Sequence, residues 1–159
     1  MKYINRVHLE NKEDVIRDIE ITETNNLEQL HFAIIDAFGL EKNEMASFYM
    51  TNDEFELLKE IPIFNIENKN NSILCMNEII ISSVFPSEGS QLLYVYDFLN
   101  MWRFLVTFDA RSKNTEDKTI CINKIGKLPK DAPEIIFEAE KEFNSSNDAF
   151  DAFNEYEEY

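Results

Sequence analysis

One stretch constrains the fold of this chain more than any other: residues 91–109, which read QLLYVYDFLNMWRFLVTFD. Around Leu99 and Asn100, apolar and aromatic side chains occupy every second position: Leu92, Tyr94, Tyr96 and Phe98 before them, and Trp102, Phe104, Val106 and Phe108 after them. Such alternation is typical of strands that bury one face. Asn100 tolerates a left-handed backbone, so the pattern predicts a tight β-hairpin over residues 92–109.

The beginning of the chain has a second regular pattern. Residues 3–9 and 15–21 alternate on either side of a polar turn and predict another hairpin. Asn26 with Gln29 forms a capping box, and Gly39 suits a helix end, so a helix is expected over residues 27–38. Residues 46–51 predict a strand. The order of hairpin, helix and strand predicts an α+β fold with a mixed sheet and a β-grasp-like start.

The remaining regular elements are less sharply marked. Residues 68–72 form an Asn/Lys-rich stretch that we expect to be a surface loop. Residues 76–86 fit a short helix and a strand equally well, because their apolar positions follow neither period. Residues 119–125 predict a further strand.

The character of the sequence changes at Glu134. Residues 134–159 contain nine acidic side chains and one lysine, interleaved with aromatic residues. We therefore expect a single α+β domain over residues 1–133 and an acidic-aromatic C-terminal segment over 134–159. Two interpretations of this segment stay open, a helix against its own domain and a disordered segment that docks on a basic, apolar groove.

Charge limits the classes of partner. The formal net charge is -16, from 15 basic and 31 acidic residues, which argues against direct binding of nucleic acid or of an anionic membrane. An unidentified protein partner, basic where it meets the acidic segment, fits better. No apolar run approaches the roughly 18 residues of a membrane span, and the first residues lack a signal-peptide pattern. These features predict a cytoplasmic protein.

No sequence motif predicts a cofactor or a metal. Cys75 and Cys121 are far apart in the chain and form no C-x-x-C pair. We expect two ordinary thiols, with a single disulfide as the alternative. Phosphate-binding glycine loops, the nucleophile elbow of hydrolases and metal-ligand spacings do not occur.

Three segments, LHFAIIDAFGL, SFYM and LLYVYDFLNMWRFLV, resemble the plasmid pRiA4b ORF-3-like family over roughly residues 3–110. The residues that carry the resemblance are Leu30, His31, Ala37, Phe38, Gly39, Phe48, Tyr94, Tyr96, Asp97, Phe98 and Trp102. The resemblance implies an α+β fold. It implies no assigned activity, since this family is known mainly from its gene neighbourhoods with plasmids and mobile elements.

Several polar positions of that family pattern carry other residues in this chain. Leu99 and Asn100 replace its Gly-Asp, Leu40 replaces a Trp, and Glu44 and Phe104 stand where the family has histidines. A glycine-rich Pro-Pro-Glu-Asp segment is reduced to GKLPKDAPE. The resemblance therefore implies a divergent member that has lost most of a polar cluster.

Asp97 and His31 are the weak candidates for catalysis. Asp97 is a carboxylate within an apolar hairpin, where the turn amides at Leu99 and Asn100 are within reach of its side chain. Acid–base chemistry needs a second titratable group. His31, on the apolar stripe of the helix, or His8 could supply it only if the fold brings one of them to Asp97. The structural alternatives are a turn anchor and a core-edge histidine, and we expect these.

The leading hypothesis is a non-enzymatic domain that acts through protein contacts, using sheet edges and the acidic-aromatic segment. The candidate binding residues are Phe32, Phe150, Phe153 and Tyr156. Phe32 lies on the polar side of the helix and is either covered by another segment or open to a partner. The alternatives are a mobile-element-associated hydrolase or nucleic-acid-processing accessory with a degenerate site, and an acidic inhibitor that mimics DNA.

Overall fold

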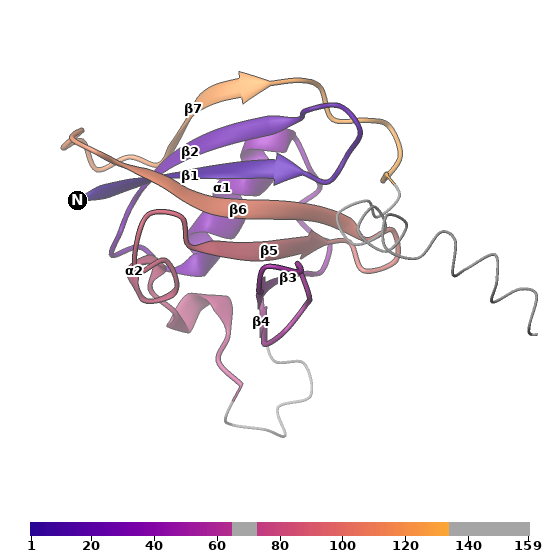
Figure 1. Cartoon of the computed structure of the whole chain (residues 1–159), viewed down its shortest axis with the longest axis horizontal. Coiled ribbons are helices and arrows are strands. Elements are labelled where there is room, and N and C mark those ends of the chain that lie inside the picture. Colours follow the sequence, from indigo (N-terminus) through magenta and orange to yellow (C-terminus); the bar gives the residue numbers. More distant parts are fainter. Residues whose placement is uncertain (65–72, 134–159) are drawn as a thin grey trace, which may run out of the picture.

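Seven strands form one sheet in the computed structural model of the chain, which describes residues 1–64 and 73–133 (Figure 1). Their order across the sheet is β4-β3-β5-β6-β1-β2-β7. The strands are β1 (Lys2–Leu9), β2 (Ile16–Thr22), β3 (Ala46–Met50), β4 (Glu60–Pro62), β5 (Gln91–Tyr96), β6 (Trp102–Ser112) and β7 (Ile120–Ile125). The helices are α1 (Leu27–Phe38), the 3-10 turn η1 (Met76–Glu78) and α2 (Ile81–Val84).

Every neighbouring pair of strands in this sheet is antiparallel, so the fold is α+β but the expected mixed sheet is wrong. The physical reason is the path after α1. The helix carries the chain across the sheet to β3, which three strands separate from β2, and β3 pairs there in the antiparallel sense with β5. The order hairpin, helix, strand is present, while the β-grasp likeness stays a prediction.

Both predicted hairpins are confirmed. β1 pairs with β2, and β5 pairs with β6 in a register that sets Tyr96 opposite Trp102. The turn between β5 and β6 therefore spans five residues rather than a tight pair at Leu99 and Asn100. Its left-handed residues are Asp97, with φ of 60°, and Met101, with φ of 55°. The expected left-handed Asn100 is wrong, because the longer turn places the reversal at its two ends.

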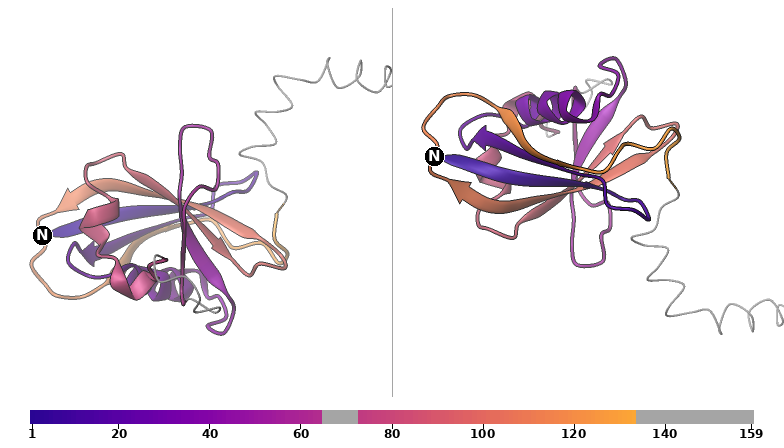
Figure 2. Two further views of the ribbon diagram at one scale, coloured as in Figure 1. Left: turned by 90° about the horizontal axis from the view of Figure 1, so that it is seen from below. Right: turned by 90° about the horizontal axis from the view of Figure 1, so that it is seen from above.

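Helix α1 covers one face of the sheet (Figure 2). It spans the predicted residues 27–38, begins with the predicted capping box of Asn26 and Gln29, and ends at Gly39 with φ of 70°. Its buried side chains are Leu27, Leu30, His31, Ile34, Ile35 and Phe38. Each fully buried aliphatic side chain stabilises the fold by about 1.5–3 kcal/mol, so this stripe fixes the helix on the sheet.

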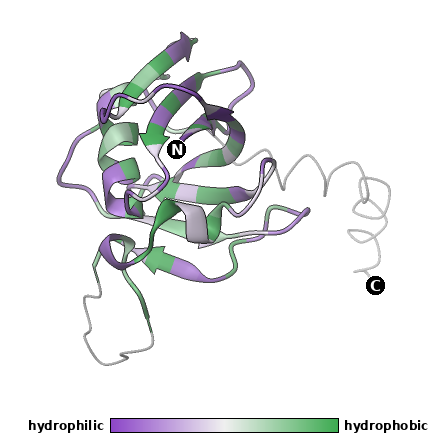
Figure 3. Cartoon of the chain, turned by 90° about the vertical axis from the view of Figure 1, so that its left-hand side faces the viewer, coloured by the Kyte–Doolittle hydropathy of each residue, from purple (hydrophilic) through white to green (hydrophobic). Residues whose placement is uncertain are grey.

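Hydrophobic and hydrophilic residues follow one another along several strands (Figure 3), and successive side chains of a strand point to opposite faces of the sheet. The α1 face is apolar and contains stacked rings such as those of Tyr3 and Phe108, whose centroids lie 3.8 Å apart. The loop between β3 and β4 projects from the opposite face (Figure 2). There Arg103 donates a hydrogen bond of 3.1 Å to the Phe55 carbonyl, so this loop is tied to β6.

The less regular segments of the sequence form one strand, a 3-10 turn and a short helix. Residues 119–125 form the predicted strand as β7, and residues 76–86 take the helical alternative as η1 and α2. The short strand β4 was not foreseen. The predicted loop at 68–72 and the segment 134–159 lie outside the described residues, and the domain boundary at residue 133 stays a prediction.

Candidate functional site

Asp97 is held by its own turn. Its carboxylate oxygens accept hydrogen bonds from the Leu99 amide at 3.2 Å and from the Asn100 side-chain amide at 2.6 Å. Its backbone amide donates to the Met45 carbonyl at 2.8 Å, and its carbonyl accepts from the Met101 amide at 2.6 Å. The side chain thus uses both oxygens to hold a left-handed reversal, which is the usual role of Asp at a turn.

His31 is a fully buried residue of α1. Its Nδ1 is 2.7 Å from the Tyr94 hydroxyl, and its Nε2 has no hydrogen-bond partner among the described residues. Burial lowers the pKa of His31 to about 4 and raises that of Tyr94 well above its ordinary value. His31 is therefore neutral near pH 7.

The hydrogen bonds described for the chain do not join His31 to Asp97. His31 is bonded to Tyr94, whose side chain lies on the α1 face of β5. Successive side chains of a strand alternate between faces, and Asp97 is three positions further along, where the strand has ended. The two candidates thus occupy separate hydrogen-bond networks, one in the core and one in the turn.

Phe32 is open to solvent. The side chain next to His31 on α1 is 41% exposed, and its ring centroid lies 4.8 Å from that of His31. Of the two alternatives for Phe32, the described chain thus leaves it uncovered. Phe150, Phe153 and Tyr156, the other candidate binding residues, lie outside the described residues.

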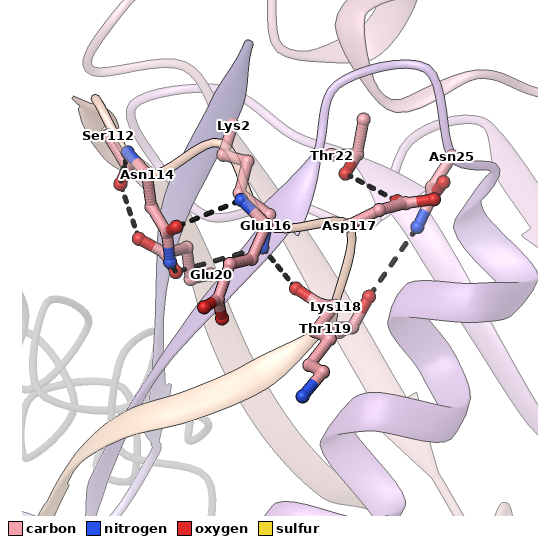
Figure 4. Close-up of polar contacts among 10 residues, drawn as sticks. All are labelled: Lys2, Glu20, Thr22, Asn25, Ser112, Asn114, Glu116, Asp117, Lys118 and Thr119. Atoms are coloured by element: carbon pink, nitrogen blue, oxygen red, sulfur yellow. Dashed lines mark hydrogen bonds and ion pairs between the residues drawn. The ribbon is translucent and has the colours of Figure 1, made fainter.

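A buried ion pair that we did not anticipate lies at one end of the sheet (Figure 4). Lys2 Nζ is 3.8 Å from Glu20 Oε1, and Lys2 also donates to the Lys118 carbonyl. Glu20 accepts hydrogen bonds from the Ser112 hydroxyl and, at 2.8 Å, from the Asn114 side chain. These bonds, that of Ser112 first, lower the pKa of Glu20 against the opposing effect of burial.

Three residues of this network, Lys2, Ser112 and Asn114, also line an open hollow of about 660 Å³. Its lining residues are Met1, Lys2, Thr22, Thr24, Ser112, Lys113, Asn114, Thr115, Glu116 and Asp117. The buried charges are compensated from within the chain, so the network fastens the β6–β7 connection to β1 and β2. A sequence signal did exist, since the hairpin register opposes Lys2 to Thr22 and Ile4 to Glu20, which places Lys2 and Glu20 diagonally on one face.

Two further charge pairs continue along the same face. Arg6 donates two hydrogen bonds to Asp18, at 2.9 and 3.0 Å, and Asn123 donates a third at 3.0 Å. Burial alone would raise the pKa of Asp18, but the bonds from Arg6 and Asn123 lower it below its ordinary value. Arg103 Nε lies 3.1 Å from Glu10 Oε1, with both side chains buried. These charges hold strands together.

Strand β7 is an outer edge of the sheet (Figure 1). Ile120, Ile122 and Ile125 are 41%, 46% and 41% exposed. Residues 118–130 contain four exposed lysines and no acidic residue, although the whole chain carries a net charge of -16: Lys118, Lys124, Lys127 and Lys130. None of the four has an ion-pair partner within the described part of the chain. This edge, residues 118–130, is called the β7 edge below.

Within residues 1–64 and 73–133, no three His, Cys, Asp or Glu side chains gather as metal ligands would. Cys75 and Cys121 are both free thiols. Across the same ranges, none of the helices has the length and apolar character that crossing a bilayer requires.

Comparison with known proteins identifies the family. The model of the plasmid pRiA4b ORF-3-like protein family matches residues 2–152. Among solved structures, the chain is similar to a protein of unknown function, MM3350 from Methanosarcina mazei Go1, with a TM-score of 0.65 and 19% identity over 93% of this chain and 82% of that one. At that identity the likeness shows the fold alone. No curated protein matches. The chain belongs to the plasmid pRiA4b ORF-3-like protein family.

Proposed function

We propose that this chain is a cytoplasmic protein-interaction domain without enzymatic activity, and that its partner binds along β7. One observation carries the proposal: an edge strand exposes three isoleucines, and the described residues place no further strand beside it. Exposed edges are usually shielded in soluble proteins, because their unpaired N–H and C=O groups can pair with a strand of another molecule and cause aggregation. An apolar edge left open is typical of strand addition.

The lysines of the β7 edge add selectivity. Charged side chains on an edge, lysine above all, oppose pairing with a second identical edge. The same charges favour a partner strand that is acidic, since opposite charges across a pair of strands stabilise it. The β7 edge therefore fits a strand that combines apolar and acidic side chains.

The polar groups elsewhere support a non-catalytic role. Both carboxylate oxygens of Asp97 accept hydrogen bonds within its turn. His31 is neutral and hydrogen-bonded to Tyr94. Glu20 is compensated by Ser112, Asn114 and Lys2. A general acid or base must be able to reach a substrate, and these groups are already engaged in holding the fold.

A capture experiment with the full chain tests the proposal. Ile122→Lys would place a charge in the apolar part of the edge, and Leu99→Lys would be the matched control, since Leu99 is 94% exposed in the β5–β6 turn. Tagged wild type and Leu99→Lys should retain the same protein from a native lysate, and Ile122→Lys should lose it. Equal thermal unfolding of the two variants would show that both are folded.

Retention of the same proteins by all three chains would overturn the role of β7. Turnover of a substrate by the purified chain, lost in His31→Gln or Asp97→Asn but not in Ile122→Lys, would overturn the non-enzymatic part of the proposal.

A further inference from the structure

The β7 edge and the acidic-aromatic segment have complementary chemistry within one chain. The edge contains four lysines, no acidic residue and three exposed isoleucines. Residues 134–159 contain nine acidic residues, one lysine and interleaved aromatics. A sequence that combines acidic and apolar side chains is what the edge fits, and residues 134–159 have that composition.

The chain that follows β7 allows the acidic-aromatic segment to reach β7. β7 ends at Ile125, and the described chain continues to residue 133, with Leu128 and Ala132 packed against the core. A strand of six residues, the length of β7, spans roughly 20 Å, and residues 134–159 supply 26 residues, more than four times the number needed to lie along it. A tether of this length keeps the segment at a millimolar effective concentration beside β7, on the order found for short linkers.

We propose that residues 143–156 of the chain dock on its own β7 edge and cover it until an external partner displaces them. The inference rests on the proposed role of β7 as a docking strand. Phe150, Phe153 and Tyr156 then cover Ile120, Ile122 and Ile125, and the carboxylates of the segment meet the four lysines of the edge. The segment is thus an internal competitor for the binding site, and it sets a threshold affinity that a partner must exceed.

The two cysteines of the chain provide a probe of this contact. Cys121 lies on β7 and Cys75 lies at the start of η1, and both are half-buried free thiols. A segment docked on β7 slows alkylation of Cys121 but not of Cys75. The ratio of the two rates, followed by mass spectrometry on the purified full chain, therefore reports coverage of the β7 edge.

Charge changes on either side of the contact should alter that ratio. Asp148→Asn, Asp151→Asn and Glu155→Gln together remove every carboxylate of residues 143–156, and Lys124→Glu with Lys127→Glu cancels the net positive charge of the β7 edge. Each set should speed alkylation of Cys121 relative to Cys75 severalfold, and so should 0.5 M NaCl, because exposed charge pairs are screened.

A charge swap and a matched neutralisation serve as controls. Adding Asp148→Lys and Asp151→Lys to the Lys124→Glu, Lys127→Glu chain exchanges the charges at these four positions and should return the ratio towards that of wild type. Glu13→Gln, Asp36→Asn and Asp53→Asn remove the same number of charges from exposed positions elsewhere, and should leave the ratio unchanged.

Two outcomes overturn the inference. One is a ratio of alkylation rates that changes with neither set of charge substitutions. The other is a ratio that depends on protein concentration, which would show that a second copy of the chain occupies the β7 edge. Failure of the inference is separable from failure of the proposed function, since this experiment contains no partner. A lost partner in Ile122→Lys with an unmoved cysteine ratio would leave the docking role of β7 intact and remove the internal segment from it.

Discussion

Asp97 combines a positive φ of 60° with two side-chain hydrogen bonds, so its replacement separates a turn anchor from a catalytic group. Asp97→Ala should lower the free energy of unfolding by about 2 kcal/mol, since it loses both bonds and keeps the left-handed strain. Asp97→Asn retains an acceptor and tolerates this backbone, so it should cost less than half as much. Urea unfolding measures both, with Asp109→Ala, an exposed position on the same hairpin, as the control.

His31 links stability to pH. Its pKa is about 4 in the folded chain and 6.5 in the unfolded one, so the unfolded chain binds the proton more readily. Stability is therefore full above pH 6.5 and falls as the pH drops towards 4, by at most about 1.4 kcal/mol per pH unit from this group.

The matching variant for this pH dependence is His31→Gln, which does not titrate. The stability difference between wild type and His31→Gln, from urea unfolding at pH 7, 6 and 5, should shrink or reverse as the pH falls. Parallel pH profiles for the two chains would contradict a buried, neutral His31.

Asn5 is a polar residue among apolar neighbours in the sheet. It lies fully buried in β1, opposite Ile19 and Phe108, and neither atom of its side-chain amide has a hydrogen-bond partner among the described residues. Asn5→Leu is similar in size and should raise the free energy of unfolding by about 1–3 kcal/mol, because an unsatisfied buried amide is removed. A loss of stability instead would contradict the prediction that the unsatisfied amide is the dominant cost at this position.

The roles of single residues were predictable where they depend on near neighbours. The capping box of Asn26 and Gln29 and the turn bonds of Asp97 follow from spacings of three residues or fewer. The bond between His31 and Tyr94 and the network of Glu20 with Ser112 and Asn114 were not predictable. They join residues 63 to 94 positions apart, which only the order of the strands brings together.

Among the elements, the short connection that follows β7 depends on a glycine. Gly126 has φ of 77°, and a Cβ there would lie 2.1 Å from the Asp14 carbonyl oxygen in the β1–β2 turn. Gly126→Ala should lower the free energy of unfolding by about 2–4 kcal/mol, through backbone strain and the displacement of that turn.

Gly89→Ala is the matched control for this element. Its φ is 97°, and a Cβ there meets nothing within 4 Å, so it carries the backbone strain alone and should cost about 1–2 kcal/mol. Similar losses in thermal unfolding for the two variants would show that the contact with Asp14 is relieved without cost.

Like the roles of single residues, the helices and strands were predictable where they depend on local sequence and not where they depend on distant parts of the chain. Hairpins and the helix were predictable because their periodicity and end signals are local. The antiparallel pairing of β3 with β5 depends on the path that α1 imposes, and the three residues of β4 are too few to show a period. The five-residue turn after β5 was missed because the register of Tyr96 with Trp102, rather than the tolerance of Asn100, decides where the chain reverses.

For the molecule as a whole, the net charge of -16 opposes compaction, because like charges are closer together in the folded chain than in the unfolded one. Two of the ion pairs that salt could weaken, Lys2 with Glu20 and Arg103 with Glu10, have both side chains buried, and buried pairs are screened little. Added NaCl should therefore raise the urea midpoint of unfolding between 10 and 300 mM, with most of the change below about 100 mM, where the Debye length is still long.

Neutralising exposed carboxylates provides the decisive comparison. Glu13→Gln, Asp36→Asn and Asp53→Asn change the net charge from -16 to -13, by three charges at exposed positions with no hydrogen bond described for their side chains. If repulsion is the cause, this variant is more stable than wild type at 10 mM NaCl, and its midpoint rises less with salt. If specific ion pairing dominates instead, salt lowers the midpoint of both chains. If the urea midpoints of the two chains rise equally with salt and differ by a constant amount, the difference in stability comes from the local effects of the three substitutions and not from repulsion across the whole molecule.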